Sequence, residues 1–130
     1  MAENPSSTPE VRLSVPAHGA FLSLIRTTSA AVAARLEMTI DEIEDLRIAV
    51  DEAAAMLLPS VAGDRSVDVV FTLGDEALTI SLSAQTEDAR APDQDGFGWT
   101  VLSALVGSVS AEHVDGRTTI VLSHRRRART

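Results

Sequence analysis

The stretch from Thr39 to Leu58, TIDEIEDLRIAVDEAAAMLL, decides the fold, because it is the clearest helix signal in the chain. Thr39 is a typical N-cap residue, and Glu42 follows three positions later, as a capping box requires. Pro59 predicts where the helix ends. Apolar residues recur at helical spacing and form one predicted buried stripe: Ile40, Ile43, Leu46, Val50, Ala53 and Leu57.

Composition narrows the class of protein. A chain of 130 residues that is 45% hydrophobic indicates one domain with a real core. The absence of Cys excludes disulfides and Cys-based metal or nucleophile sites. The net charge of −8 disfavours nucleic acid as the main partner. All eleven basic residues are Arg, so a Walker-type phosphate site, which needs Lys, is excluded.

The sequence carries no targeting signal that we recognise. No apolar run approaches the roughly 20 residues of a membrane span. The first ten residues, MAENPSSTPE, are polar and acidic and do not fit a secretory signal. We therefore expect a cytoplasmic protein with no membrane contact. Residues 1–9 are predicted to be a disordered leader, residues 10–124 the domain, and residues 125–130 a basic tail.

The elements before the central helix are a strand and a helix. Glu10–Val15 alternates apolar and polar residues, which predicts a half-buried strand. Residues 19–36 predict a helix that leaves Arg26 and Arg35 off its apolar side. Its predicted buried stripe consists of Phe21, Leu24, Ile25, Thr28, Val32 and Leu36.

The rest of the chain reads as strands around one short helix. The predicted elements are a turn at Ala62–Ser66, strands at Val67–Leu73 and Ala77–Ser83, a loop at Gln85–Asp95, a helix at Trp99–Val106, and strands at Val109–Val114 and Thr118–Ser123. Because strands and helices do not alternate strictly, this order predicts an α+β fold. We expect a mixed, mostly antiparallel sheet of about five strands, covered on one face by three helices.

This order, with LRIAVDEA at residues 46–53 and GFG at residues 96–98, resembles the GHKL fold, also called the Bergerat or histidine-kinase ATPase-like fold. It looks most like the anti-sigma serine kinases of the RsbW and SpoIIAB type, and like their shorter actinobacterial members. The resemblance covers roughly residues 10–124 and implies a two-layer sandwich. It also implies one of two activities, namely sequestration of a sigma factor or phosphorylation of its antagonist.

The family's nucleotide motifs are only partly present. Glu52 matches the Glu that acts as general base, but Met56 stands where the family has a magnesium-binding Asn. A thioether is a poor ligand for Mg²⁺, which prefers oxygen. The adenine-binding Asp-x-Gly-x-Gly segment is missing, and Asp88 is the nearest acid.

Two glycine segments complete the partial match. Gly96 and Gly98 match the second Gly-rich turn, and residues 116–118 loosely match a late Gly-Thr. An ordinary turn from loop to helix explains the first two glycines equally well. We therefore expect Glu52 to be vestigial, and no ATP or Mg²⁺ cofactor. The three His residues share no metal-ligand spacing, so no metal site is predicted.

The resemblance also implies a partner-binding residue on the first helix. The family has an Arg there that contacts both the sigma factor and a STAS-domain anti-anti-sigma protein, and this position falls on Arg26. Ser23, Thr27 and Ala30 are its predicted neighbours in the contact. The alternative is an ordinary solvated Arg. The family further implies a homodimer formed through the sheet and first helix.

Three hypotheses follow. The first is an anti-sigma factor that sequesters a stress- or development-type sigma factor until a STAS-domain antagonist releases it. The second is an active serine/threonine kinase that phosphorylates that antagonist with ATP, and the residue at position 56 discriminates between the two. The third is a module of the same fold with an unrelated partner.

Overall fold

The predicted central helix is α2, Ile40–Leu57, in the computed structural model of the chain, which describes residues 8–87 and 92–126. The Thr39 hydroxyl accepts the N–H of Glu42 at 3.1 Å, and the Glu42 carboxylate accepts the N–H of Thr39 at 2.8 Å. The capping box is therefore confirmed, and it fixes the residue at which α2 begins.

Five strands form one sheet in the order β1-β2-β3-β5-β4, and every neighbouring pair is antiparallel. The α+β prediction is confirmed, although the sheet contains no parallel pair. The strands are β1 (Glu10–Pro16), β2 (Ser66–Leu73), β3 (Ala77–Gln85), β4 (Ser108–Val114) and β5 (Arg117–Arg125).

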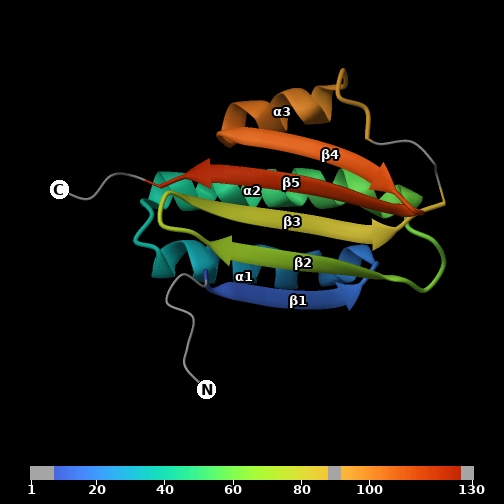
Figure 1. The fold of residues 1–130 in the computed structure, drawn as a ribbon, viewed down its shortest axis with the longest axis horizontal. Coiled ribbons are helices and arrows are strands. Elements are labelled where there is room, and N and C mark those ends of the chain that lie inside the picture. The colour runs from blue at the N-terminus through green and yellow to red at the C-terminus, as the bar shows by residue number, and fades with distance from the viewer. Residues whose placement is uncertain (1–7, 88–91, 127–130) are drawn as a thin grey trace.

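The helices form a second layer on one face of this sheet, and the other face carries no helix (Figure 1). α1 (Leu22–Arg35) follows the short helix η1 (Gly19–Phe21) and lies beside α2. α2 continues into the short helix η2 (Leu58–Ser60). α3 (Phe97–Leu105) packs against the other side of α2 and leads into β4. Of the described helices, none is long and apolar enough to cross a membrane.

The core lies between α2 and the inward side of the sheet. Strand residues of one parity are buried, as in β3, where the burial alternates along the whole strand. The main members are Phe71, Leu78, Ile80, Leu82, Ile120 and Leu122 from the sheet and Leu46, Val50, Ala53 and Leu57 from α2. Burying a large aliphatic or aromatic side chain contributes about 1.5–3 kcal/mol, so this interface supplies most of the stabilisation.

The predicted stripe of α2 is confirmed except at its first residue. Ile40 is 84% exposed, because it occupies the first turn and its side chain leans toward the start of the helix, away from the core. Ile43 is half-buried, and the other four predicted positions are buried. Ala49 and Ala54 complete the buried face.

The predicted stripe of the first helix is partly wrong. The buried residues of α1 are Ile25, Ser29, Val32 and Ala33, whereas Leu24 is 49% exposed and Phe21 is 37% exposed. Small residues at 29 and 33 let α1 pack closely, and this geometry turns the larger Leu24 outward. The Ser29 hydroxyl donates to the Ile25 carbonyl at 2.8 Å, so its burial leaves no polar group unsatisfied.

β5 extends beyond the predicted strand end, through His124 and Arg125. His124 lies on the same, core-facing side of β5 as the buried Ile120 and Leu122. Its Nε2 lies 3.1 Å from the Glu42 carboxylate. The end of β5 is thereby joined to the first turn of α2. The remaining predicted tail, residues 127–130, and residues 1–7 of the predicted leader lie outside the described residues.

The Glu42 carboxylate predicts an acid-sensitive contribution to stability. Its hydrogen bond from the Thr39 backbone, with help from His124, lowers the pKa of Glu42 below its ordinary value of 4.5 despite partial burial. A lowered pKa stabilises the fold above pH 4.5, and this contribution is lost as the pH falls through the lower value in the folded protein. Glu42→Gln keeps an oxygen that can accept the Thr39 N–H but loses the negative charge at the start of α2, so it should reduce the free energy of unfolding at pH 7 by about 0.3–1 kcal/mol.

Urea unfolding at pH 7 and at pH 3 measures this effect. The difference between Glu42→Gln and the wild type should shrink as the pH falls through the lowered pKa of Glu42, because protonation then removes the same charge from the wild type. Glu44→Gln, on an exposed position of the same helix, is the matched control. An equal loss at both pH values would show that charge at position 42 does not matter.

Candidate functional site

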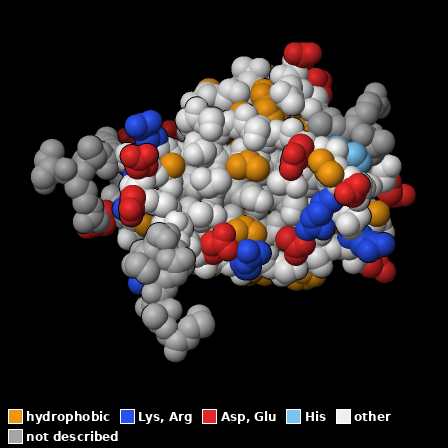
Figure 2. Space-filling model, viewed as in Figure 1, with side chains coloured by type: hydrophobic (Ala, Val, Ile, Leu, Met, Phe, Trp, Pro, Cys, Tyr) orange, Lys and Arg blue, Asp and Glu red, His pale blue; other side chains and the backbone are white. Residues whose placement is uncertain are grey.

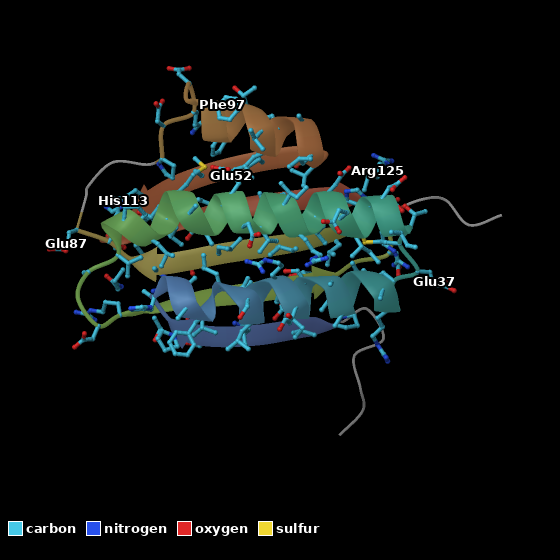
Figure 3. All side chains as sticks on the ribbon, turned by 180° about the vertical axis from the view of Figure 1, so that it is seen from behind. Glu37, Glu52, Glu87, Phe97, His113 and Arg125 are labelled. Carbon is cyan, nitrogen blue, oxygen red and sulfur yellow. The ribbon has the colours of Figure 1, made fainter. Side chains whose placement is uncertain are left out.

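The residues that match the nucleotide motif come from α2 and α3 and lie together. Glu52 and Met56 stand one turn apart on α2, and Gly98 belongs to the first turn of α3. A Cβ atom placed on Gly98 would lie 2.8 Å from Glu52 Oε2 and 3.3 Å from Met56 Sδ. Figure 3 shows Glu52 directed toward the end of α3 that carries Phe97. The structure therefore brings three of the sequence-predicted positions into one contact.

This contact is a packed one. Gly98 approaches Glu52 so closely that an added methyl group would force the carboxylate to move. The amino end of a helix carries partial positive charge, and the Glu52 carboxylate lies near that end of α3. The arrangement suits an electrostatic contact between α2 and α3. Met56 adds a thioether at the same place, so the contact holds only one oxygen-bearing side chain.

Gly96 does not share in this contact. It is the N-cap of α3, with φ −81° and ψ 169°, a conformation open to any residue. A Cβ there would lie 3.1 Å from Asp93 Oδ2 in the preceding loop. The two glycines of the GFG segment therefore have different neighbours. Asp88 lies outside the described residues.

The late Gly-Thr segment, residues 116–118, contributes a glycine to a hairpin turn and a threonine whose hydroxyl is buried. Asp115 and Gly116 have φ values of 53° and 77°, as a two-residue hairpin turn requires, and they join β4 to β5. The Thr118 hydroxyl lies 2.7 Å from the Thr86 hydroxyl and 2.8 Å from His113 Nδ1. Thr118 and Thr86 are buried, and the cluster satisfies their hydroxyl groups within the protein.

The predicted partner-binding residues lie on α1. Arg26 Nε donates to both carboxylate oxygens of Asp51 on α2, each at 2.9 Å. The side chains are 35% and 42% exposed, so the ion pair lies at the surface of the helical layer. Ser23 and Thr27 are exposed and Ala30 is half-buried. Arg26 is thus partly exposed and is paired with a carboxylate of the neighbouring helix.

The sequence analysis missed three residues of these clusters. Thr86 follows β3 at the next position that faces the core, after Leu78, Ile80, Leu82 and Ala84. His113 lies on the same side of β4 as the half-buried Val109 and Ala111. Those patterns could have located both. Asp51 had no such signal, because it is one of six acidic residues between positions 41 and 52 and nothing local sets it apart. Among the described residues, no group of three or more His, Asp and Glu side chains could hold a metal ion.

Comparison with known proteins gives two kinds of relative. The chain is 35% identical over 109 residues to the anti-sigma-F factor RsbW of Mycobacterium tuberculosis H37Rv, an alignment that covers 82% of this chain and 63% of that protein. It is 24% identical over 135 aligned positions to the serine-protein kinase RsbW of Bacillus cereus B4264, covering 88% of this chain and 84% of that protein. The chain thus spans less than two thirds of the mycobacterial relative.

Comparison of structures supports the same fold. The chain superposes on a crystal structure of the RsbU and RsbW domains of a Mycobacterium tuberculosis protein with a TM-score of 0.71 and 19% sequence identity. The match covers 94% of this chain and 34% of that one. The fold described above therefore corresponds to one part of that longer chain. No family model matches the chain.

The contact between Gly98 and Glu52 predicts a coupling between α2 and α3. Replacing Gly by Ala in a helix stabilises by about 0.5–1 kcal/mol when the methyl group has room. In the wild type, Gly98→Ala should bring no gain, because the new Cβ would meet the Glu52 carboxylate at 2.8 Å. In a Glu52→Ala background, the same change should be stabilising. Thermal unfolding of the four proteins measures the difference.

Gly96→Ala is the matched control, because its nearest neighbour is Asp93 and its effect should be the same in both backgrounds. Additive effects of Gly98→Ala and Glu52→Ala would mean that the two residues do not press on one another in solution.

Proposed function

Because this chain belongs to the RsbW-type family, we propose that it is an anti-sigma factor that binds and sequesters an alternative sigma factor of the stress or development type. A STAS-domain anti-anti-sigma protein would release the sigma factor by competing for the same surface. The observation that carries this proposal is the likeness to the anti-sigma-F factor RsbW, 35% identical over 109 residues. Sigma factors act in the bacterial cytoplasm, and the proposal places the chain there.

The proposed contact surface is centred on Arg26 of α1. Ser23, Thr27 and Ala30 flank it on the same helix, and their small side chains leave the guanidinium accessible. Arg is a frequent energetic centre of protein interfaces, because it combines charge, several donors and a long apolar stem. Both partners would need this one residue, so their binding would be mutually exclusive.

We propose further that the chain does not transfer phosphate. Mg²⁺ must bridge and neutralise the phosphates during transfer, and Met56 offers a thioether where an oxygen ligand is needed. The close approach of Gly98 to Glu52 also leaves no space between these two residues for a phosphate group. Both observations support a domain that binds protein rather than a magnesium nucleotide.

The rival function is a serine/threonine kinase that phosphorylates the STAS-domain antagonist. The relative from Bacillus cereus named serine-protein kinase RsbW favours it, as does the presence of Glu52 at the position of the general base. The two functions differ in whether the chain binds Mg²⁺ and ATP.

A homodimer is also part of the proposal. The sheet and α1 would take part, as the family resemblance implies. Figure 2 shows the open face of the sheet with few hydrophobic side chains and with charged side chains scattered over it. Such a surface suits a polar and reversible contact between two copies of the chain better than an obligate one.

Capture of a sigma factor tests the first proposal. The purified chain should retain one sigma factor from a lysate of its own bacterium, identified by mass spectrometry. Arg26→Glu should then lower the measured affinity at least about tenfold, as expected for a central interface Arg. Arg35→Glu makes the same charge change at an exposed position near the end of α1 and should bind normally. Equal affinity in both variants would remove Arg26 from the site.

Calorimetry with Mg²⁺ and ATP tests the second proposal. We expect no heat of binding at micromolar concentrations for the wild type. Met56→Asn restores an oxygen ligand but not the missing Asp-x-Gly-x-Gly segment, so it should not restore binding by itself. Micromolar binding by the wild type, or transfer of labelled γ-phosphate to a STAS-domain protein, would favour the kinase instead.

A further inference from the structure

The ion pair between Arg26 and Asp51 joins α1 to α2 within the proposed partner surface. Asp51 approaches only Nε of the guanidinium, with both oxygens at 2.9 Å. Within residues 8–87 and 92–126, these are the only hydrogen bonds of the Arg26 side chain. Its two terminal nitrogens, which carry four of the five N–H donors of an arginine, are therefore available to another molecule.

The surroundings of the pair leave those terminal nitrogens accessible. Residues three and four positions away on a helix are neighbours on its surface. Around Arg26 these positions hold Leu22, Ser23, Ser29 and Ala30, and around Asp51 they hold Arg47, Ile48, Ala54 and Ala55. Ser23 and Ala55 have short side chains and are exposed, whereas Arg47 and Ile48 are larger. The Arg26 side chain is 35% exposed, so a partner can reach the guanidinium on the side of Ser23 and Ala55.

An exposed ion pair of this kind contributes little to stability. Its effect on Arg26 is more important, because a free arginine loses considerable side-chain freedom when it enters an interface. An arginine already held at Nε has lost part of that freedom in the unbound protein. The paired terminal nitrogens match the two oxygens of a carboxylate, which is the group that arginine binds in a bidentate manner.

From this geometry we infer that Asp51 is a positioning residue of the partner surface, which holds Arg26 across the two helices so that its terminal nitrogens receive an Asp or Glu carboxylate of the bound protein. The inference rests on the proposed function and names the chemistry of the contact. Asp51 stays in place when the partner binds, because it and the incoming carboxylate use different edges of the guanidinium. The positive guanidinium lies between these two carboxylates, and its attraction to each of them offsets their mutual repulsion.

The opposite role would make Asp51 a competitor. In that case the partner would have to displace Asp51 from Arg26, and removing Asp51 would tighten binding. The two roles predict changes of opposite sign, so one series of variants separates them.

The experiment compares Asp51→Ala and Asp51→Asn for binding to the sigma factor captured by the wild type. Asp51→Ala should weaken affinity about threefold to tenfold, the cost of ordering one long side chain. Asp51→Asn keeps an oxygen that accepts from Nε and should stay within about twofold of the wild type, since it loses charge but not the hydrogen bond. In an Arg26→Ala background, Asp51→Ala should have no further effect. Glu10→Ala, which removes the ion pair to Arg12 on β1, is the matched control.

A second measurement needs no partner. Nuclear magnetic resonance of the Arg26 Nε–Hε group should report an ordered side chain in the wild type and in Asp51→Asn, and a mobile one in Asp51→Ala. Tighter binding of Asp51→Ala, or an Arg26 side chain that stays equally ordered in it, would overturn the inference. A wild type that captures no sigma factor would overturn the proposed function, and the carboxylate contact with it, while the order of Arg26 would still decide whether Asp51 positions it.

Discussion

The structure depends on the burial of one stripe of α2 against the inward side of a five-stranded sheet. Leu46, Val50 and Leu57 fill the space above the central strands, and β3 contributes an inward residue at every second position. Because this interface occupies one side of α2, the two flanking helices can only pack at its edges. The candidate contacts therefore lie on either side of the same helix, with α1 along one edge and α3 along the other.

The capping box and the apolar stripe made α2 predictable. Both depend on neighbours within a few positions of the chain, and such short-range patterns are written directly in the sequence. The strands predicted at Val67–Leu73 and Ala77–Ser83 were found for the same reason, because strand-forming residues and a hairpin turn are local signals. The stripe of α1 failed because many of its residues are small and give no strong periodic signal, so packing against α2 decided which side is buried.

The residues of the candidate site could be predicted from the sequence, but the contacts among them could not. The resemblance located Glu52, Met56 and Gly98, but only the fold shows that Gly98 presses on the Glu52 carboxylate. The pair of Arg26 and Asp51 joins positions that are 25 residues apart, and His124 reaches Glu42 across 82 residues. No local pattern specifies pairs at such separations. The sequence gives one kind of hint of such a contact, namely a polar residue at a strand position that faces the core, such as His124 or Thr86.

Asp51 and Glu52 are consecutive in the chain, and consecutive positions on a helix point about 100° apart. One therefore contacts α1 and the other approaches α3. Any change that rotates α2 about its own axis would disturb both contacts in a single movement. Glu52 and Asp51 therefore tie the positions of α3 and α1 to one and the same rotational setting of α2.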